Sequence, residues 1–324
     1  MMQFLAIGIG AGAAAALLFA SVTSGAWFSI PLFYLAPLPI MIAGLGWSHW
    51  AALIASLTGA VALAAIFGLV FLFGFLAGAG VPAWWLGYLA MLARPVGATN
   101  GQSGPQLEWY PPGRLVIWAA VLAALVVLVS VPHFGMDVES FRAGLRKALE
   151  TILRPEIGSV GDAPLPTPGR TDRLLDFLVS AIPPAAAVLA TITNLLNLWL
   201  AGRVVKFSGR LARPWPQLSA MTFPGWLAAV LALTVILSFV DGLIGIVAGI
   251  VSATLLLAFG LLGFAVLHAI TQGLQVRSLI LGLAYAAVLL LGWPILALCL
   301  LGLVDTAIDF RGRVARKRGP PALS

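Results

Sequence analysis

The sequence predicts an all-α protein, a polytopic transmembrane helical bundle of about eight or nine spans with one amphipathic interfacial helix. Hydrophobic residues make up 61% of the 324-residue chain and charged residues only 9%, whereas a soluble domain carries roughly 25% charged residues. Long stretches also lack charge: no charged residue precedes Arg94, and Asp241 is the only one between Arg213 and Arg277. Because one span needs about 20 apolar residues, these stretches hold several spans.

Nine apolar segments are predicted to form the spans. In chain order they are roughly 4–22, 30–46, 50–67, 68–93, 114–132, 174–202, 224–240, 243–271 and 279–304. The first lacks the basic residues that open a secretory signal, and further spans follow it, so we expect a retained helix. The fourth contains Gly78, Gly80 and Pro82, which predicts either a kinked span or two half-helices.

Prolines interrupt the second segment, IPLFYLAPLPIMIAG, at Pro31, Pro37 and Pro39. A proline removes one helix hydrogen bond and frees a carbonyl. Such backbone is tolerated at membrane depth only where protein or a water-filled cavity satisfies it. Pro37 and Pro39 therefore predict a kink at the wall of a pocket, or a simple separation of the first two spans. Both alternatives predict an interruption, and only the first predicts a cavity.

Two polar interruptions occur, a loop at 94–113 and a larger insertion at 133–173. We divide the chain into four parts: an N-terminal transmembrane bundle (1–132), an amphipathic helix with a proline-rich linker (133–173), a C-terminal transmembrane bundle (174–310) and a basic tail (311–324). In 133–173, apolar residues recur at helical spacing opposite the charges, which predicts a helix on the bilayer surface. Asp137 suits its N-cap, and Pro155 is expected to end it. The apolar positions are Val138, Phe141, Leu145, Leu149 and Ile152.

The net charge of +7 comes from basic residues that cluster at span ends, which is typical of topology and headgroup contacts and does not indicate nucleic-acid binding. If 174–202 and the last three segments each cross once, the basic 203–222 loop and the basic tail lie on opposite sides. The favoured orientation puts 133–173 and the tail, with 11 of the 18 Lys and Arg residues, in the cytoplasm. We therefore expect a cytoplasmic tail.

A polar face runs along the sixth segment, since its polar and small residues follow one another at steps of three or four. They are Asp176, Ser180, Pro184, Ala187, Thr191, Asn194 and Asn197. The leucines, Ile192 and Trp199 lie largely elsewhere. Because polar groups facing lipid are unfavourable, this face should turn toward protein or a wet cavity. Its amides either bond neighbouring helices, at roughly 0.6–2 kcal/mol each, or line a solute pocket.

The eighth segment repeats this theme, because Gly260, Phe264, His268 and Gln272 recur every four residues. His268 is either an interfacial hydrogen-bonding group or a ligand. With two other histidines and one cysteine in the chain, we expect no metal site and no cofactor. The candidate pocket-lining residues are Thr191, Asn194, Asn197, His268, Gln272, Pro37 and Pro39.

The last segment ends in Asp305, Asp309 and Arg313, whose spacing of four predicts a ladder of ion pairs on one helical face. The ladder would neutralise a helix exit or dock another protein. The chain contains no nucleophile elbow, HExxH or P-loop, so we expect no catalytic activity.

The ordered set PLFYLAPLPIMIAGLGW, EWYPPGRLVIW, NLLNLWLAGRVVKFSGRLARPWP, LLGFAVLHA and LLGLVDTAIDFRGR resembles the uncharacterised YybS-like family of bacterial inner-membrane proteins. The resemblance covers about residues 4–313 and implies location without activity. The first segments are also similar to substrate-binding subunits of energy-coupling-factor transporters, helical bundles that a separate ATPase module drives. Their small-xxx-small docking signature has a counterpart in Ala11 and Ala15, or Ala16 and Ala20.

Two functions of different classes follow from these features. The first is a transporter-like solute-binding or permease component that a partner protein energises. The alternative is a non-catalytic membrane scaffold for envelope or cell-surface assembly, and an integral-membrane enzyme acting on lipid ranks third. The expected partners are the lipid bilayer, a small-molecule solute and an energising or scaffold protein.

Overall fold

The computed structural model describes residues 2–96, 106–135, 137–159 and 168–318. Most of these residues are helical, and β1 (Ala93–Val96) and β2 (Gln106–Trp109) form one short antiparallel hairpin. The helical elements are α1 (Met2–Ala20), η1 (Ser21–Ser24), α2 (Ser29–Tyr34), α3 (Pro37–Gly46), α4 (His49–Phe67), α5 (Leu69–Phe75), η2 (Leu76–Gly80), α6 (Val81–Ala90), α7 (Pro112–Phe134), α8 (Val138–Ser159), α9 (Pro168–Phe207), η3 (Leu218–Ala220), α10 (Trp226–Leu237), α11 (Leu243–Ile270), α12 (Arg277–Leu291), α13 (Ile295–Ile308) and α14 (Phe310–Arg318).

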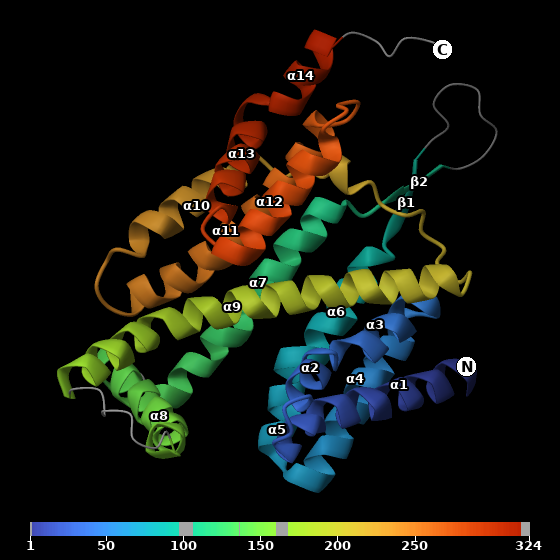
Figure 1. The fold of residues 1–324 in the computed structure, drawn as a ribbon. Helices are drawn as coiled ribbons and strands as arrows, with labels where there is room; N and C mark the ends of the chain where they lie inside the picture. The colour runs from blue at the N-terminus through green and yellow to red at the C-terminus, as the bar shows by residue number, and fades with distance from the viewer. Residues whose placement is uncertain (1, 97–105, 136, 160–167, 319–324) are drawn as a thin grey trace.

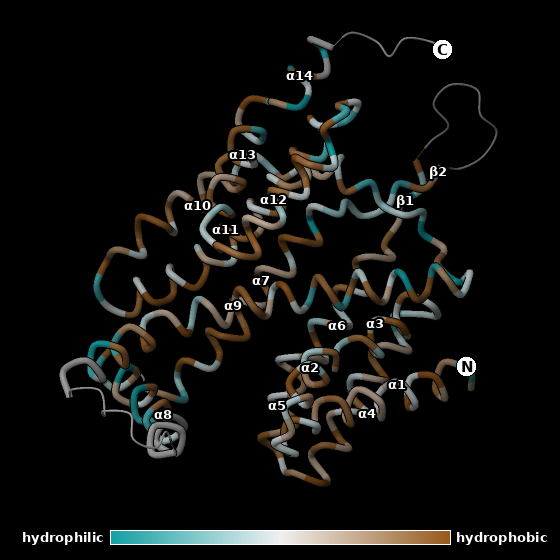
Figure 2. The backbone as a smooth tube through the Cα atoms, viewed as in Figure 1, coloured by the Kyte–Doolittle hydropathy of each residue, from teal (hydrophilic) through white to brown (hydrophobic). Residues whose placement is uncertain are grey.

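In the described part of the chain, seven helical stretches are long and apolar enough to cross a membrane. They are Met2–Ser24, Ser29–Gly46, His49–Phe67, Leu69–Ala90, Pro112–Phe134, Asp172–Phe207 and Leu243–Ile270. The apolar helices α10, α12 and α13 are shorter. Figure 2 shows hydrophobic residues along most helices and hydrophilic ones at α8 and the connecting segments. The predicted fold class, an all-α polytopic helical bundle, is confirmed.

Two hydrophobic clusters form the main core. The first surrounds Ile40 and Phe75 and combines residues of α1, α3, α4 and α6. The second surrounds Phe259 and Leu262 of α11 and includes residues of α7, α10 and α13. Helix α9 packs against α3, α7 and α11 and so joins the two clusters, as its long oblique course in Figure 1 shows.

The predicted interruptions in the second and fourth segments are both present. The second segment divides into α2 and α3, and Pro37 is the first residue of α3. The fourth remains one helical span, because a π-helical turn at Leu76–Gly80 joins α5 to α6. A π turn widens the backbone ring, and the Ser56 hydroxyl of α4 donates to the Gly80 carbonyl at 3.0 Å.

The single span predicted for 279–304 is wrong. Gly292 has a left-handed φ of 75° and Pro294 follows it, so the segment divides into α12 and α13. These helices have 15 and 14 residues, or about 22 and 21 Å at 1.5 Å per residue. Each is shorter than the hydrocarbon core, which is about 30 Å thick.

The extra reversal changes which chain segments share a side of the bundle. Arg311 of α14 donates to the carbonyls of Ser219 at 2.7 Å and Met221 at 2.8 Å, so the tail and the 203–222 loop lie together. The prediction that they lie on opposite sides is wrong. We call their end of the bundle the tail side; Figure 1 places the β1–β2 hairpin there and α8 at the opposite end. The prediction that placed the amphipathic helix on the same side as the tail is therefore also wrong for α8.

Helix α8 is amphipathic and begins as predicted. The Asp137 carboxylate accepts the backbone N–H of Ser140 at 2.8 Å, and hydrogen bonds from Ser140 lower the pKa of Asp137 below its usual value. The prediction that Pro155 ends this helix is wrong, because α8 continues to Ser159. Phe141 and Leu145 are buried against Val179 of α9, so the apolar face of α8 packs partly on the bundle.

Candidate functional site

The predicted polar face of α9 is buried against protein. Thr191, Asn194 and Asn197 are 0%, 3% and 1% exposed, and α9 contacts α3, α7 and α11. The Asn197 amide donates to the carbonyls of Tyr34 and Thr193, both at 2.8 Å. The Thr191 hydroxyl donates to Ala187 within its own helix. These are contacts of helix packing, which is one of the two alternatives that the sequence left open.

The hydrogen bond from Asn197 to Tyr34 compensates for the donor that is missing at the proline break. Pro37 has no N–H to offer the Tyr34 carbonyl, and the N–H of Leu38 bonds to Leu35 instead. The side chain of Asn197 therefore supplies the donor that the backbone cannot. Pro37 is buried and Pro39 half-buried at the start of α3.

An open groove with a volume of about 790 Å³ lies on the other side of α9. Its walls come from the ends of α3, α6 and α11, the start of α7, the first nine residues of α12, the C-terminal half of α9 and the 211–221 segment. The α9 wall consists of Ile192, Leu195, Leu196, Leu198, Trp199 and Gly202. Sequence reasoning missed this groove because it assigned these apolar residues to the face away from any pocket.

Among the seven candidate pocket residues, only His268 lines this groove. Its Nε2 lies 2.9 Å from the Tyr285 hydroxyl of α12, and Tyr285 stacks on Phe264 with ring centroids 4.5 Å apart. Gln272 is exposed in the turn after α11. Asn197 therefore bonds to the backbone at the proline break and His268 lies against Tyr285 of α12. The seven candidate residues do not surround one cavity.

Two arginines line the groove, and the described lining contains no Asp or Glu. Arg213 is buried and donates to the carbonyls of Ala90 at 2.9 Å and Tyr110 at 2.8 Å. This burial lowers the pKa of Arg213 from its usual value, and the guanidinium remains protonated at neutral pH. Arg277 is the first residue of α12, and its Nε is buried without a hydrogen-bond partner among the described residues.

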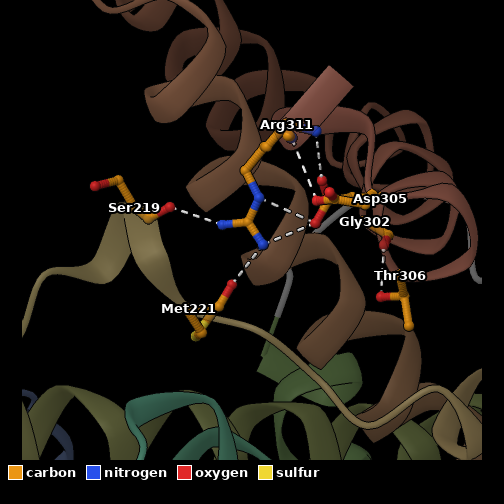
Figure 3. Close-up of polar contacts among 8 residues, drawn as sticks. Ser219, Met221, Gly302, Asp305, Thr306 and Arg311 are labelled. Atoms are coloured by element: carbon orange, nitrogen blue, oxygen red, sulfur yellow. Dashed lines mark hydrogen bonds and ion pairs between the residues drawn. The ribbon is translucent and has the colours of Figure 1, made fainter. Parts of the chain in front are cut away.

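A buried ion pair holds the 218–221 wall in place (Figure 3). The Arg311 guanidinium donates to the Asp305 carboxylate through Nη2 at 2.7 Å and Nε at 3.0 Å. Its remaining donors reach the carbonyls of Ser219 and Met221, and both of these residues line the groove. Asp305 and Arg311 thus fasten one groove wall to the junction of α13 and α14.

The predicted ladder of Asp305, Asp309 and Arg313 is wrong. Asp309 has a left-handed φ of 50° and ends α13, so the three residues do not continue on one helical face. Asp309 lies 3.9 Å from Arg316 instead. Arg313 donates through Nε to the Ile308 carbonyl at 2.8 Å.

The groove belongs to a region that the chain shares with a known family. No curated protein and no solved structure matches the chain. The family described as "Predicted membrane protein (DUF2232)" matches residues 13–306, a range that includes every residue lining the groove and Asp305 of the buried ion pair. The chain therefore belongs to the DUF2232 family of predicted membrane proteins.

Proposed function

We propose that this protein is a transporter-like solute-binding component of the bacterial inner membrane, and that its solute is an amphiphile bound in the groove. The observation that carries the proposal is the apolar groove of about 790 Å³. Small-molecule sites are typically clefts of about 300–1,000 Å³ with mostly apolar walls and a few polar groups. The groove has this size and this lining, with His268, Arg213, Arg277 and Tyr285 among its polar groups.

The depth of the groove suits a molecule from the bilayer. Along α9 its wall runs from Ile192 to Gly202, a rise of ~15 Å at 1.5 Å per residue. The hydrocarbon core is about 30 Å thick, so this length is comparable to the thickness of one leaflet. An amphiphile can therefore lay its chain along the leucines of α9 and keep its polar end on the tail side.

Helix α12 provides a side through which such a molecule can pass. It has no buried residue, and its side-chain contacts with α11 include the stack of Tyr285 on Phe264 and the bond to His268. Gly273 and Gly292, just outside its two ends, have left-handed φ angles of 78° and 75°. A helix held by so few contacts can move away from α11 at low energetic cost.

In this proposal a separate partner protein supplies the energy, as the resemblance to energy-coupling-factor subunits implies. The inner-membrane location in the proposal follows from the likeness to YybS-like proteins. A scaffold for envelope or cell-surface assembly is the second candidate. The burial of Thr191, Asn194 and Asn197 between helices favours it, since those groups serve packing and a scaffold needs no occupant in the groove.

A groove-filling variant tests the proposal. Leu196 lines the groove and is 48% exposed, so Leu196→Trp fills the space without displacing core side chains. We expect it to lower the retention of added dioleoyl phospholipids by about tenfold, measured by native mass spectrometry of delipidated, detergent-purified protein. The matched control is Leu189→Trp, which lies two turns earlier on the same face, is 43% exposed and does not line the groove.

The result that would overturn the proposal is equal lipid retention by Leu196→Trp, Leu189→Trp and the wild type. Both variants must first elute as single peaks and melt within a few degrees of the wild type. Equal retention would leave the groove without a ligand-binding role, as the scaffold alternative requires.

A further inference from the structure

We propose that the groove selects lipids with an anionic phosphate headgroup, and that Arg277 binds the phosphate. This inference rests on the proposed function, because it names the class of amphiphile that the groove accepts. It draws on three features of the described residues: the charge of the lining, the unpartnered nitrogen of Arg277 and the position of Arg277 in the fold.

The charge of the lining is one-sided. Arg213 and Arg277 both line the groove, and the described lining contains no Asp or Glu. The ion pairs among the described residues do not include either arginine. A groove with cationic groups and no counter-charge attracts an anionic occupant, and its apolar walls strengthen that attraction.

The two arginines differ in what they bind. Arg213 directs its two Nη atoms to the carbonyls of Ala90 and Tyr110, so it holds the wall together. Arg277 has a buried Nε without a hydrogen-bond partner among the described residues. An unsatisfied buried donor is unfavourable, and a phosphate oxygen satisfies a guanidinium in the planar, two-bond geometry that arginine favours.

The start of α12 adds to the same effect. Arg277 is its first residue, the first turn contains no acidic residue, and Val276 provides no side-chain cap. The N-terminus of a helix carries partial positive charge and free N–H groups. A guanidinium there is poorly placed unless an anion lies beside it. A phosphate would accept both from Arg277 and from the open first turn.

The surroundings place this charge at headgroup depth. Arg277 begins α12 on the tail side, where α11 has just ended at Ile270. Across the groove, Trp199 and Trp215 line the wall, and the guanidinium of Arg203 lies 5.8 and 5.7 Å from their ring centroids. Tryptophan and arginine together mark the membrane–water interface. The cationic end of the groove thus coincides with the level at which lipid phosphates lie.

The test compares two lipids with the same chains and different headgroup charge. Delipidated full-length protein is given dioleoyl phosphatidic acid or dioleoyl phosphatidylcholine, and bound lipid is quantified by native mass spectrometry. We expect the wild type to prefer phosphatidic acid by about tenfold. Arg277→Gln should remove most of that preference and weaken phosphatidylcholine binding less, because the choline cation of that lipid already offsets its phosphate charge. Arg277→Lys should retain part of the preference, because a lysine keeps the charge without the bidentate geometry.

Arg114→Gln is the matched control. Arg114 is an exposed arginine near the start of α7 on the same side of the bundle, and it does not line the groove. We expect this variant to keep the wild-type preference. A salt titration of the wild type needs no variant: raising NaCl from about 0.05 to 0.5 M should weaken phosphatidic acid binding and spare phosphatidylcholine.

Three results would overturn the inference: equal binding of both lipids by the wild type, an unchanged preference in Arg277→Gln, or displacement of phosphatidic acid by equimolar glycerol 3-phosphate, which would identify a soluble phosphate ester. If both lipids bind equally and Leu196→Trp abolishes both, the headgroup inference fails while the proposed function stands. If Leu196→Trp affects neither lipid, the proposed function itself fails.

Discussion

Asn197, Arg213 and Arg311 have the same structural role, since each donates to backbone carbonyls where a helix is broken or ends. Asn197 reaches Tyr34 at the α2–α3 break, and Arg311 reaches Ser219 and Met221 in the 208–225 connection. In a membrane an unsatisfied carbonyl is costly because no water replaces the missing donor. At the scale of single residues, these three side chains are therefore structural. The Nε of Arg277 and the Nε1 atoms of Trp47, Trp84 and Trp85 lack an acceptor among the described residues, and of these four residues Arg277 lines the groove.

Asn197→Leu should destabilise the fold by about 1–3 kcal/mol, because it leaves the Tyr34 carbonyl buried without a donor. Steric-trapping measurements of unfolding in detergent micelles would measure the change. Thr191→Val is the control, since Thr191 is equally buried and its hydroxyl bonds only within α9. A loss as large in Thr191→Val as in Asn197→Leu would contradict this role of the amide.

Helix contacts depend on where small residues lie and on where helices stop. A Cβ at Gly263 would clash with the Leu298 carbonyl oxygen, and one at Gly302 with the Phe259 carbonyl oxygen. Helices α11 and α13 can therefore pack backbone to backbone, as small residues permit in membranes. The break at Gly292 and Pro294 also determines helix contacts. It turns α13 back along α11 and leaves α12 to form a groove wall.

Gly263→Leu should separate α11 from α13 and cost at least about 1–3 kcal/mol, the range for overpacking a close contact. We expect a lower melting temperature and less monodisperse protein by fluorescence-detected size-exclusion chromatography. Gly249→Leu on the same helix is the control, because a Cβ there meets no atom within 4 Å. Wild-type behaviour of Gly263→Leu would show that the two helices do not pack as closely as described.

Charge is distributed unequally between the two ends of the whole molecule. Among residues whose side chains the structure describes, the tail side carries ten basic residues, namely Arg94, Arg114, Arg203, Lys206, Arg210, Arg213, Arg277, Arg311, Arg313 and Arg316, and three acidic ones, Glu108, Asp305 and Asp309. The α8 side carries four basic residues, Arg142, Arg146, Lys147 and Arg173, and six acidic ones, Asp137, Glu139, Glu150, Asp172, Asp176 and Asp241. By the positive-inside rule, the tail side should be cytoplasmic.

Cysteine labelling can test this orientation, because the one native cysteine, Cys299, is buried. In intact cells a membrane-impermeant maleimide should label Glu139→Cys in the first turn of α8 and leave Ser208→Cys on the tail side unlabelled. Both should react after permeabilisation, and the wild type should react in neither case. Labelling of Ser208→Cys alone in intact cells would reverse the assignment and place the tail outside.

Local properties of the chain were enough to predict much of this molecule. The all-α membrane fold follows from the length and hydropathy of each segment, and the burial of Asn194 and Asn197 from their helical spacing with other small and polar residues. The break in 279–304 was also readable, since Gly292 and Pro294 form a turn signal. Counting that segment as one span led to the wrong placement of the tail relative to the 203–222 loop.

The sequence by itself therefore determined the class of fold, the amphipathic helix α8 and the burial of Thr191, Asn194 and Asn197, because each depends on residues close together in the chain. Only the tertiary structure decided that Asn197 bonds a carbonyl 163 positions away, that Arg311 holds the groove wall and that Arg277 lines the same groove as the leucines of α9. Both faces of α9 are compatible with burial, and periodicity cannot tell a packed face from one that lines a groove. That choice depends on which distant helices pack beside it.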